Sequence, residues 1–305
     1  MILTKTPLRI SFVGGGSDRP SFYGEEPGAC VAAAIDKYVY VAANPKYDGS
    51  IRAAYSVTEN VATVDELQHE LIREALKLTG VRGIEVHSIA DIPGGTGLGS
   101  SSAFTVGLLA ALHESTHIIA EEACHIEIDR CHKPIGKQDQ YTAAYGGLNL
   151  LGFTSQGVTV SPIACDLDAL SAHCLLLDTG LTRHGDAGAV LSGQAQDRDD
   201  VRGLVSIARD FANQLSDGDL ELCGALMADA WEIKRRFIGS LFDQMYRAAR
   251  KAGAWGGKLC GAGGGGFLLF LAPPERHQAI VQALGLRHVP LRVGVPGCEV
   301  VYAST

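Results

Sequence analysis

The sequence predicts an α+β fold with two domains. Segments typical of strands and of helices are mixed along the chain, without the strict alternation that a doubly wound parallel sheet requires. The length of 305 residues is enough for two domains or one large one. No internal repeat or low-complexity tract interrupts the chain. We place the boundary near residues 160–172 and assign residues 1–168 to a first domain and 169–305 to a second.

The first half is expected to contain five strands and four helices. Residues 30–42 are small, apolar and β-branched, which is typical of a long buried strand. Apolar residues recur with helical spacing between residues 64 and 79, and Gly80 follows as a stop signal. The complete expectation is strands at 8–13, 30–42, 51–57, 84–89 and 148–153, and helices at 64–79, 100–114, 118–131 and 136–145.

The second half is expected to begin with a strand and to end with strands. Its middle has long stretches of helical periodicity, and a glycine-rich segment lies between the first two of the closing strands. The expected strands are 173–179, 258–260, 267–271, 291–293 and 299–302, and the expected helices are 187–215, 220–236, 241–251 and 274–284.

Composition narrows the class of protein. The net charge of -8 and the sequence pI of about 5.7 argue against nucleic acid as a partner. No apolar run is long enough to cross a bilayer, and the N-terminal residues lack the features of a signal peptide. The eight cysteines are scattered and form no Cys-x-x-Cys pair, so we expect neither disulfides nor zinc. These features predict a cytoplasmic protein without a membrane partner.

The most informative segment runs from Asp91 to Ala103 and leads directly into an apolar run. Such a loop leaves backbone N–H groups unpaired at the start of a helix, where the helix dipole adds partial positive charge. Glycines allow an anion to approach the backbone closely, and hydroxyls can reach phosphate or a metal. No Walker-type lysine motif occurs in the chain. The expected ligand of this loop is therefore the polyphosphate of a nucleotide. The residues that we expect to bind it are Gly94, Gly95, Thr96, Gly97, Leu98, Gly99, Ser100, Ser101 and Ser102.

Two further glycine-rich segments accompany this loop, and the three together resemble the motifs of the GHMP kinase superfamily. Residues 7–18 are similar to the first motif, 93–103 to the second and 258–267 to the third. Residues 136–141, followed by 146–149, are similar to a narrower branch. That branch contains D-glycero-D-manno-heptose-7-phosphate kinase and the related fucokinase domains. The resemblance covers nearly the whole chain.

The resemblance implies an N-terminal domain like ribosomal protein S5, a ferredoxin-like C-terminal domain, and an active site in the cleft between them. It also implies an ATP- and Mg²⁺-dependent sugar kinase. The expected reaction phosphorylates the anomeric C1 hydroxyl of D-glycero-D-manno-heptose 7-phosphate, for nucleotide-activated heptose in surface polysaccharide synthesis. A kinase of a free sugar such as L-fucose and a non-catalytic sugar or nucleotide sensor are the alternatives. The resemblance is compatible with a homodimer and does not fix the oligomeric state.

The resemblance also assigns catalytic roles. Asp139 would be the catalytic base and would orient the acceptor hydroxyl, although an ordinary carboxylate is a weak base towards a sugar hydroxyl. Helix capping is its alternative role. Arg9 would stabilise charge near the transferred phosphoryl group, and an ordinary ion pair at a strand end is the alternative.

The resemblance also implies that Ser101 and Glu127 would hold a magnesium ion. Mg²⁺ usually takes one or two carboxylates and completes its shell with phosphate and water. The alternative for Glu127 is a solvated helix face, since other acidic residues crowd the same region. The histidines of residues 113–132 lack ligand spacing, and we interpret them as solvated or packed.

The sugar is expected to meet residues from all three motifs. Asp18 would accept hydrogen bonds from sugar hydroxyls, with an Asx-turn before Pro20 as the alternative. A distal phosphate requires cations, for which Lys137, Arg183 and the run 234–236 are candidates, and Arg183 is preferred. The remaining substrate-binding residues implied by the motifs are Gly16, Ser17, Gly147, Gly263 and Gly264. Segments 114–120 and 237–242 are shorter than in the branch, which affects the choice of sugar.

Overall fold

Two sheets form the framework of the molecule. This computed structural model describes residues 1–113, 118–181, 197–237, 240–261 and 263–304. The larger sheet has eight strands, and its main path runs β12-β1-β2-β5-β3-β4, with β6 and β7 continuing from β2. Its strands are β1 (Ile2–Val13), β2 (Gly28–Pro45), β3 (Ile51–Ala54), β4 (Thr58–Val61), β5 (Ile84–Ala90), β6 (Leu148–Thr154), β7 (Gly157–Pro162) and β12 (Glu299–Ala303).

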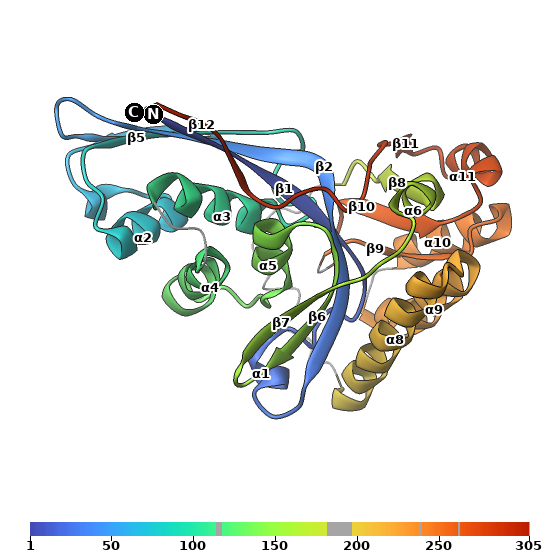
Figure 1. The fold of residues 1–305 in the computed structure, drawn as a ribbon. Coiled ribbons are helices and arrows are strands. Elements are labelled where there is room, and N and C mark those ends of the chain that lie inside the picture. Colours follow the sequence, from blue (N-terminus) through green and yellow to red (C-terminus); the bar gives the residue numbers. More distant parts are fainter. Residues whose placement is uncertain (114–117, 182–196, 238–239, 262, 305) are drawn as a thin grey trace.

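The helices between β5 and β6 lie against one face of this sheet (Figure 1). The central helix is α3 (Ser100–Leu112), which is apolar on all sides and almost entirely buried. Its surroundings explain that pattern, because strands β1 and β2 and other helices pack around it. The other helical segments are α1 (Pro20–Tyr23), η1 (Val64–Glu66), α2 (Glu70–Thr79), α4 (Ile119–Cys124), η2 (His125–Arg130) and α5 (Gln138–Tyr145).

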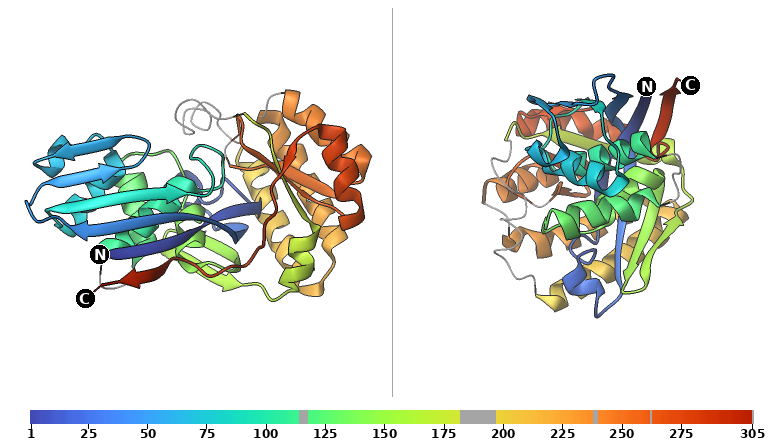
Figure 2. Two further views of the ribbon diagram at one scale, coloured as in Figure 1. Left: turned by 90° about the horizontal axis from the view of Figure 1, so that it is seen from above. Right: turned by 90° about the vertical axis from the view of Figure 1, so that its left-hand side faces the viewer.

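The smaller sheet belongs to the second half and has the order β11-β8-β10-β9. Its strands are β8 (Cys174–Asp178), β9 (Gly256–Leu259), β10 (Phe267–Leu271) and β11 (Arg287–His288). The helical segments of this half are α6 (Leu167–His173), α8 (Arg198–Asp217), α9 (Leu220–Lys234), η3 (Arg235–Phe237), α10 (Ser240–Ala252), η4 (Pro274–Arg276) and α11 (His277–Leu284). Figures 1 and 2 show this half beside one end of strands β1 and β2 of the large sheet.

The two halves share a core. One hydrophobic cluster includes Phe12 of β1, Leu269 of β10 and Phe211 of α8. The rings of Phe12 and Phe211 stack with their centroids 5.3 Å apart. The chain also returns at its end, because β12 pairs antiparallel with β1 and brings the two termini together (Figure 2). Residues 299–303 therefore lie in the large sheet, although they follow the second half in sequence.

Several predicted elements differ from the structure. Residues 51–57 form no single strand, because β3 ends at Ala54 and a turn leads into β4. Residues 291–293 make only an isolated bridge, from Val293 to Ile35. β7 and α6 were not predicted, and both lie near the expected domain boundary. The predicted helix at 187–215 is described from Arg198, and its first ten residues lie outside the described part.

Two predicted elements agree with the structure in whole or in part. The helix expected at 64–79 begins only at Glu70, after the short turn η1, but it ends at Gly80 as predicted, with Gly80 in the left-handed conformation at φ +71°. The long strand expected at 30–42 is β2, extended at both ends. Among the described residues, no helix is both long and apolar enough to span a membrane.

Candidate active site

The loop at residues 94–102 joins β5 to α3 and bends through glycines with positive φ. Gly95, Gly97 and Gly99 have φ of +78°, +81° and +75°, a region that side chains with a Cβ rarely adopt. α3 begins at Ser100, so the N–H groups of its first turn lack partners within the helix. Gly94, Gly95 and Ser101 are exposed, whereas Thr96, Leu98 and Ser102 are buried. The loop thus has an exposed side for a ligand and a side that packs on the protein.

The third glycine-rich segment packs against this loop. A Cβ on Gly97 would lie 2.6 Å from the carbonyl oxygen of Cys260, and one on Gly266 would lie 2.0 Å from that of Thr96. Both glycines therefore permit a close approach of two backbones. In the same segment Gly263 is buried and Gly264 is exposed. The contact brings the second half of the chain to the candidate nucleotide loop.

Arg9 and Asp139 form a bidentate pair beside the loop. Arg9 Nε and Nη2 donate to Asp139 Oδ1 and Oδ2, each at 2.7 Å, and Arg9 Nη1 donates to the carbonyl of Gly97 at 2.6 Å. Arg9 is buried, and the Asp139 side chain retains some exposure. Burial lowers the pKa of Arg9, but the Asp139 carboxylate raises it, together with Cys260 and Asp18, and the net pKa is raised. The Asp139 side chain thus bonds to Arg9 rather than capping α5.

Asp18 is 3% exposed and is held by backbone donors. The N–H of Gly16 donates to its Oδ1 at 3.0 Å, and the N–H of Gln138 donates to its Oδ2 at 3.3 Å. Burial raises the pKa of Asp18, and the charge of Asp139 raises it further, while the backbone bonds oppose the rise. These bonds differ from an Asx-turn before Pro20. They tie the first glycine segment to the start of α5.

Ser17 stabilises the same segment from inside. Its side chain is fully buried, and Oγ lies 2.9 Å from Gly14 O and 3.0 Å from Ala29 O. Oγ also accepts the N–H of Ala29 at 3.1 Å. With its hydroxyl engaged by the backbone, Ser17 supports the turn, and the half-buried Gly16 beside it is more accessible to a ligand.

Glu127 lies in η2, a π-helical turn, and is 0% exposed. Ser101 and Thr105 donate to Oε1 at 2.9 and 3.1 Å, and Ser102 donates to Oε2 at 2.6 Å. Gln140 also donates to Oε2. Burial raises the pKa of Glu127, and the hydroxyl donors oppose this rise. The predicted alternative of a solvated face is wrong, because this carboxylate is enclosed at the start of α3.

The oxygen atoms of Glu127 and Ser101 fit as ligands of a magnesium ion that is bound together with a nucleotide. Mg²⁺ is usually held by one or two carboxylates, and substrate phosphates and water complete its shell. Glu127 supplies the carboxylate and Ser101 an exposed hydroxyl oxygen 2.9 Å away. Within the described residues, no group of three or more His, Cys, Asp or Glu side chains could hold a metal. An ion here would therefore depend on phosphate ligands.

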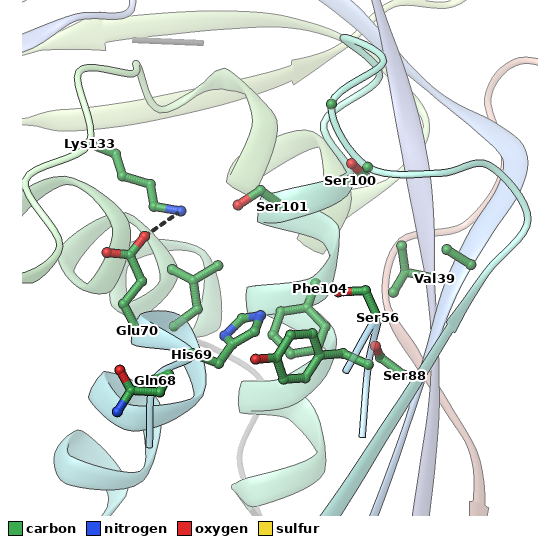
Figure 3. Close-up of a pocket in the computed structure, with 15 residues that line it drawn as sticks. Val39, Ser56, Gln68, His69, Glu70, Ser88, Ser100, Ser101, Phe104 and Lys133 are labelled. Carbon is green, nitrogen blue, oxygen red and sulfur yellow. Dashed lines mark ion pairs between the residues drawn. The ribbon is translucent and has the colours of Figure 1, made fainter. Parts of the chain in front are cut away.

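A pocket opens beside the exposed side of the loop (Figure 3). Its volume is about 550 Å³. Its lining residues come from β2, the β3–β4 turn, α2 and the two residues before it, β5, the loop at 94–102, α3 and the segment after η2. They are Val39, Tyr55, Ser56, Gln68, His69, Glu70, Leu71, Ser88, Ala90, Gly94, Gly95, Ser100, Ser101, Phe104 and Lys133. Apart from the loop residues, sequence reasoning did not find this set. It is assembled from separate segments that carry no shared motif.

The pocket is lined by aromatic rings and by polar and charged side chains. His69 lies between Tyr55 and Phe104, with ring centroids 4.5 and 5.3 Å away. Burial lowers the pKa of His69, and nearby Lys133 lowers it further, which favours the neutral ring. Lys133 pairs with Glu70 at 3.0 Å, as Figure 3 shows. A neutral aromatic surface of this kind suits a flat heterocycle.

The predicted cations for a distal phosphate have other partners or lie outside the described residues. Lys137 donates to Glu121 at 2.9 Å, and Arg236 pairs with Asp200 at 2.8 Å. Lys234 donates to the carbonyls of Leu259 and Gly261. Arg183 lies outside the described residues.

Gly147 is engaged through its backbone. Its N–H donates to Val295 O at 2.7 Å, and its carbonyl accepts the N–H of Ala34 at 2.9 Å. Its position therefore links β2 to the C-terminal segment. The bonds that surround it are structural.

The fold and the loop together define a nucleotide-dependent phosphotransferase, and comparison with known families supports this class. Residues 63–147 match the GHMP kinases N-terminal domain, and residues 208–289 match the GHMP kinases C-terminal domain. The chain belongs to the GHMP kinases, which use ATP, and has their two-domain fold.

Its relatives include sugar kinases. A D-glycero-alpha-D-manno-heptose 7-phosphate kinase of Campylobacter jejuni is 26% identical, and the match covers 93% of each chain. An L-fucokinase/L-fucose-1-P guanylyltransferase of Bacteroides fragilis is 27% identical, over 94% of this chain and 36% of that protein. The structure of a D-glycero-D-manno-heptose 1-phosphate kinase from Bacteroides thetaiotaomicron has a TM-score of 0.82 at 24% identity, covering 99% of this chain and 100% of that one.

Proposed function

We propose that this protein is an ATP-dependent sugar kinase that phosphorylates the anomeric hydroxyl of D-glycero-D-manno-heptose 7-phosphate to give the 1,7-bisphosphate. One observation carries the proposal. The pocket is continuous with the loop at Gly94, Gly95, Ser100 and Ser101, and the Arg9–Asp139 pair contacts the same loop through Gly97. A nucleoside, its phosphates and an acceptor would thus each have a place along one path. The heptose relatives support the choice of sugar.

In this proposal the base and ribose of ATP lie in the pocket near His69 and Phe104. The phosphates lie on the backbone amides of the loop and the first turn of α3, where no lysine is required. Ser101 and Glu127 would hold Mg²⁺, which neutralises charge on phosphate oxygens when bound.

Transfer then depends on position and electrostatics. The Asp139 carboxylate accepts a hydrogen bond from the acceptor hydroxyl and takes its proton late, as the new O–P bond forms and the bond to ADP breaks. Because Arg9 holds both oxygens of Asp139, the carboxylate has one fixed orientation. The guanidinium also offsets negative charge on the transferred phosphoryl group.

The proposal is tested by incubating the purified protein with γ-labelled ATP, Mg²⁺ and a panel of sugars. The panel contains D-glycero-D-manno-heptose 7-phosphate, other sugar phosphates, L-fucose and D-galactose. We expect ADP release and a labelled bisphosphate with the heptose phosphate. Turnover of unphosphorylated fucose alone would overturn the choice of substrate. Nucleotide binding without turnover of any sugar would indicate a sensor.

A further inference from the structure

Lys258 is a buried lysine that the assigned site does not use. It lies in β9 and is 9% exposed. Across the described ranges of the chain, its ammonium has no hydrogen bond and no ion pair. A buried ammonium without a partner is unfavourable, because the charge loses its water shell and gains nothing in exchange. Such a group requires a reason, and binding of an anionic ligand would supply one.

The strand geometry directs Lys258 towards the candidate active site. Alternate residues of a strand share a face, so Lys258 lies on the same side as Cys260. Cys260 belongs to the main core cluster together with Leu8 and Ile10 of β1, whereas Leu259 packs in the second cluster. The carbonyl of Cys260 is also the atom that a Cβ on Gly97 would meet. Lys258 therefore lies on the face of β9 that is turned to the main core cluster, and the charge of Arg9 on β1 acts on it there.

The charged and titratable neighbours of Lys258 come from four segments. They are Cys260 directly after β9, Arg9 on β1, Cys30 on β2 and Asp18 after the first glycine segment. Burial, the largest cause, and the positive charge of Arg9 together lower the pKa of Lys258 to about 8, although the cysteines and Asp18 oppose the fall. Arg9 and Lys258 thus repel one another, and Asp18 opposes the effect of this repulsion on Lys258.

We propose that Lys258 is a substrate-contacting residue, whose ammonium acts with the Arg9 guanidinium to receive the anionic oxygens of the transferred phosphoryl group. The inference rests on the proposed kinase function and deepens it. Two cations that repel one another in the free protein are both stabilised when an anion lies between them. Their charge then acts where negative charge develops during transfer, from a position that is already fixed.

The test compares wild type with Lys258→Met and Lys258→Arg, by measuring kcat and kcat/KM from pH 6 to 10 with Mg·ATP and the best sugar acceptor. In wild type, kcat/KM should fall above pH 8 as the free lysine loses its proton. Lys258→Met should lower kcat about 100-fold. Lys258→Arg should keep more activity than the methionine variant and lose the alkaline fall, because arginine stays protonated.

A thermal unfolding measurement separates this role from a structural one. Methionine removes an unpaired buried charge, so Lys258→Met should unfold at the same temperature as wild type or higher. Lys234→Met is the matched control, because that lysine donates to two backbone carbonyls beside the same strand. It should lower the unfolding temperature and keep the alkaline fall.

Each other outcome counts against the proposal. A Lys258→Met variant that keeps kcat within threefold of wild type overturns it, as does an alkaline fall that persists in Lys258→Arg. A lower unfolding temperature with an unchanged pH profile would make Lys258 structural. If wild type phosphorylates no sugar, the proposed function fails first and this inference fails with it. An active wild type with unaffected lysine variants removes this inference alone.

Discussion

Glu127 and Asp139 are both held beside the loop at 94–102, but by partners of different charge. Glu127 is fully enclosed and receives four neutral donors, three of them hydroxyls of α3. Asp139 keeps some exposure and has a permanent cation, Arg9, on both of its oxygens. Helix α5 links the two regions, because Gln140 donates to Glu127 and its neighbour Asp139 accepts from Arg9.

The difference indicates what each region lacks. Among the described residues no cation bonds to the Glu127 carboxylate, and Lys133, whose charge acts on it from a distance, pairs with Glu70. A cation brought in with a nucleotide would therefore be stabilised there. The Asp139 region has its counter-charge already, so the carboxylate is oriented and ready to accept a hydrogen bond. The first region thus suits metal and phosphate, and the second suits a neutral hydroxyl.

Asp139→Asn tests the acceptor region and should have the largest effect. The amide keeps the shape but cannot accept a proton, and one of its ends becomes a donor facing Arg9. Turnover should fall about 100- to 10,000-fold while ATP still binds. Stability should fall by about 2 kcal/mol, because a buried guanidinium loses a charged partner. Steady-state ADP release, nucleotide titration and urea unfolding measure the three quantities.

The control for this variant is Asp129→Asn, which removes an exposed carboxylate that contacts His125. It should match wild type in all three measurements. Equal turnover of Asp139→Asn and wild type would remove Asp139 from the mechanism, and loss of ATP binding would place it in the nucleotide region instead.

Glu127→Gln tests the metal region. The change removes the charge and keeps the size, so the Mg²⁺ concentration for half-maximal activity should rise about 10- to 100-fold. Saturating Mg²⁺ should restore part of the turnover. Glu122→Gln, whose carboxylate pairs with His113, is the control and should leave the Mg²⁺ dependence unchanged. An unchanged Mg²⁺ dependence in Glu127→Gln would limit Glu127 to orienting the serines.

These two regions also differ in how much of their structure is predictable from the sequence. The glycine loop was found because its glycines and serines are packed more densely than an ordinary turn requires, and the strand that ends at the first motif was found by its apolar pattern. The sequence predicts catalytic roles for Arg9 and for Asp139 separately, but it does not predict that these residues, 130 positions apart, pair with each other. Long-range pairs of this kind depend on how helices and strands pack, which local patterns do not encode.

The pocket beside the loop at 94–102 and the strand β12 show the same limit. Tyr55, His69 and Phe104 are ordinary residues in a turn, a helix start and a helix, and only the packing of α2 and α3 brings their rings together. The last strand was predicted as a strand, but its return to β1 could not be read from its own residues.

Gly97→Ala tests the contact that joins the two regions. Gly97 has φ +81°, and an added Cβ would lie 2.6 Å from the carbonyl oxygen of Cys260. We expect a loss of about 2–4 kcal/mol and roughly tenfold weaker ATP binding, because the loop must move to relieve the clash. Gly218→Ala is a matched control with the same φ of +81° and open space around the added atom. It should cost about 1 kcal/mol and leave ATP binding unchanged.

If both alanine variants lose equal stability and ATP affinity is unaffected, then the backbone conformation alone matters at Gly97. The contact between the second and third glycine segments would then contribute nothing to nucleotide binding.

Asp18→Asn should have the smallest effect of these variants. The quantity affected is the pH dependence of the free energy of unfolding, measured without ligands. Its pKa is raised in the folded protein, chiefly by burial, so the folded state binds a proton more tightly than the unfolded state. Its contribution to stability is therefore present below the ordinary pKa of about 4 and is lost as pH rises through the raised value. The slope from this one group is at most about 1.4 kcal/mol per pH unit. Urea unfolding of Asp18→Asn at several pH values should lack this part of the decline, whereas Asp210→Asn, at an exposed position on α8, should keep it. Parallel curves of stability against pH for wild type and Asp18→Asn would contradict this prediction. They would mean that the backbone N–H donors of Gly16 and Gln138 fully offset the burial of this carboxylate. Asp18 would then be a charged acceptor for sugar hydroxyls in the site.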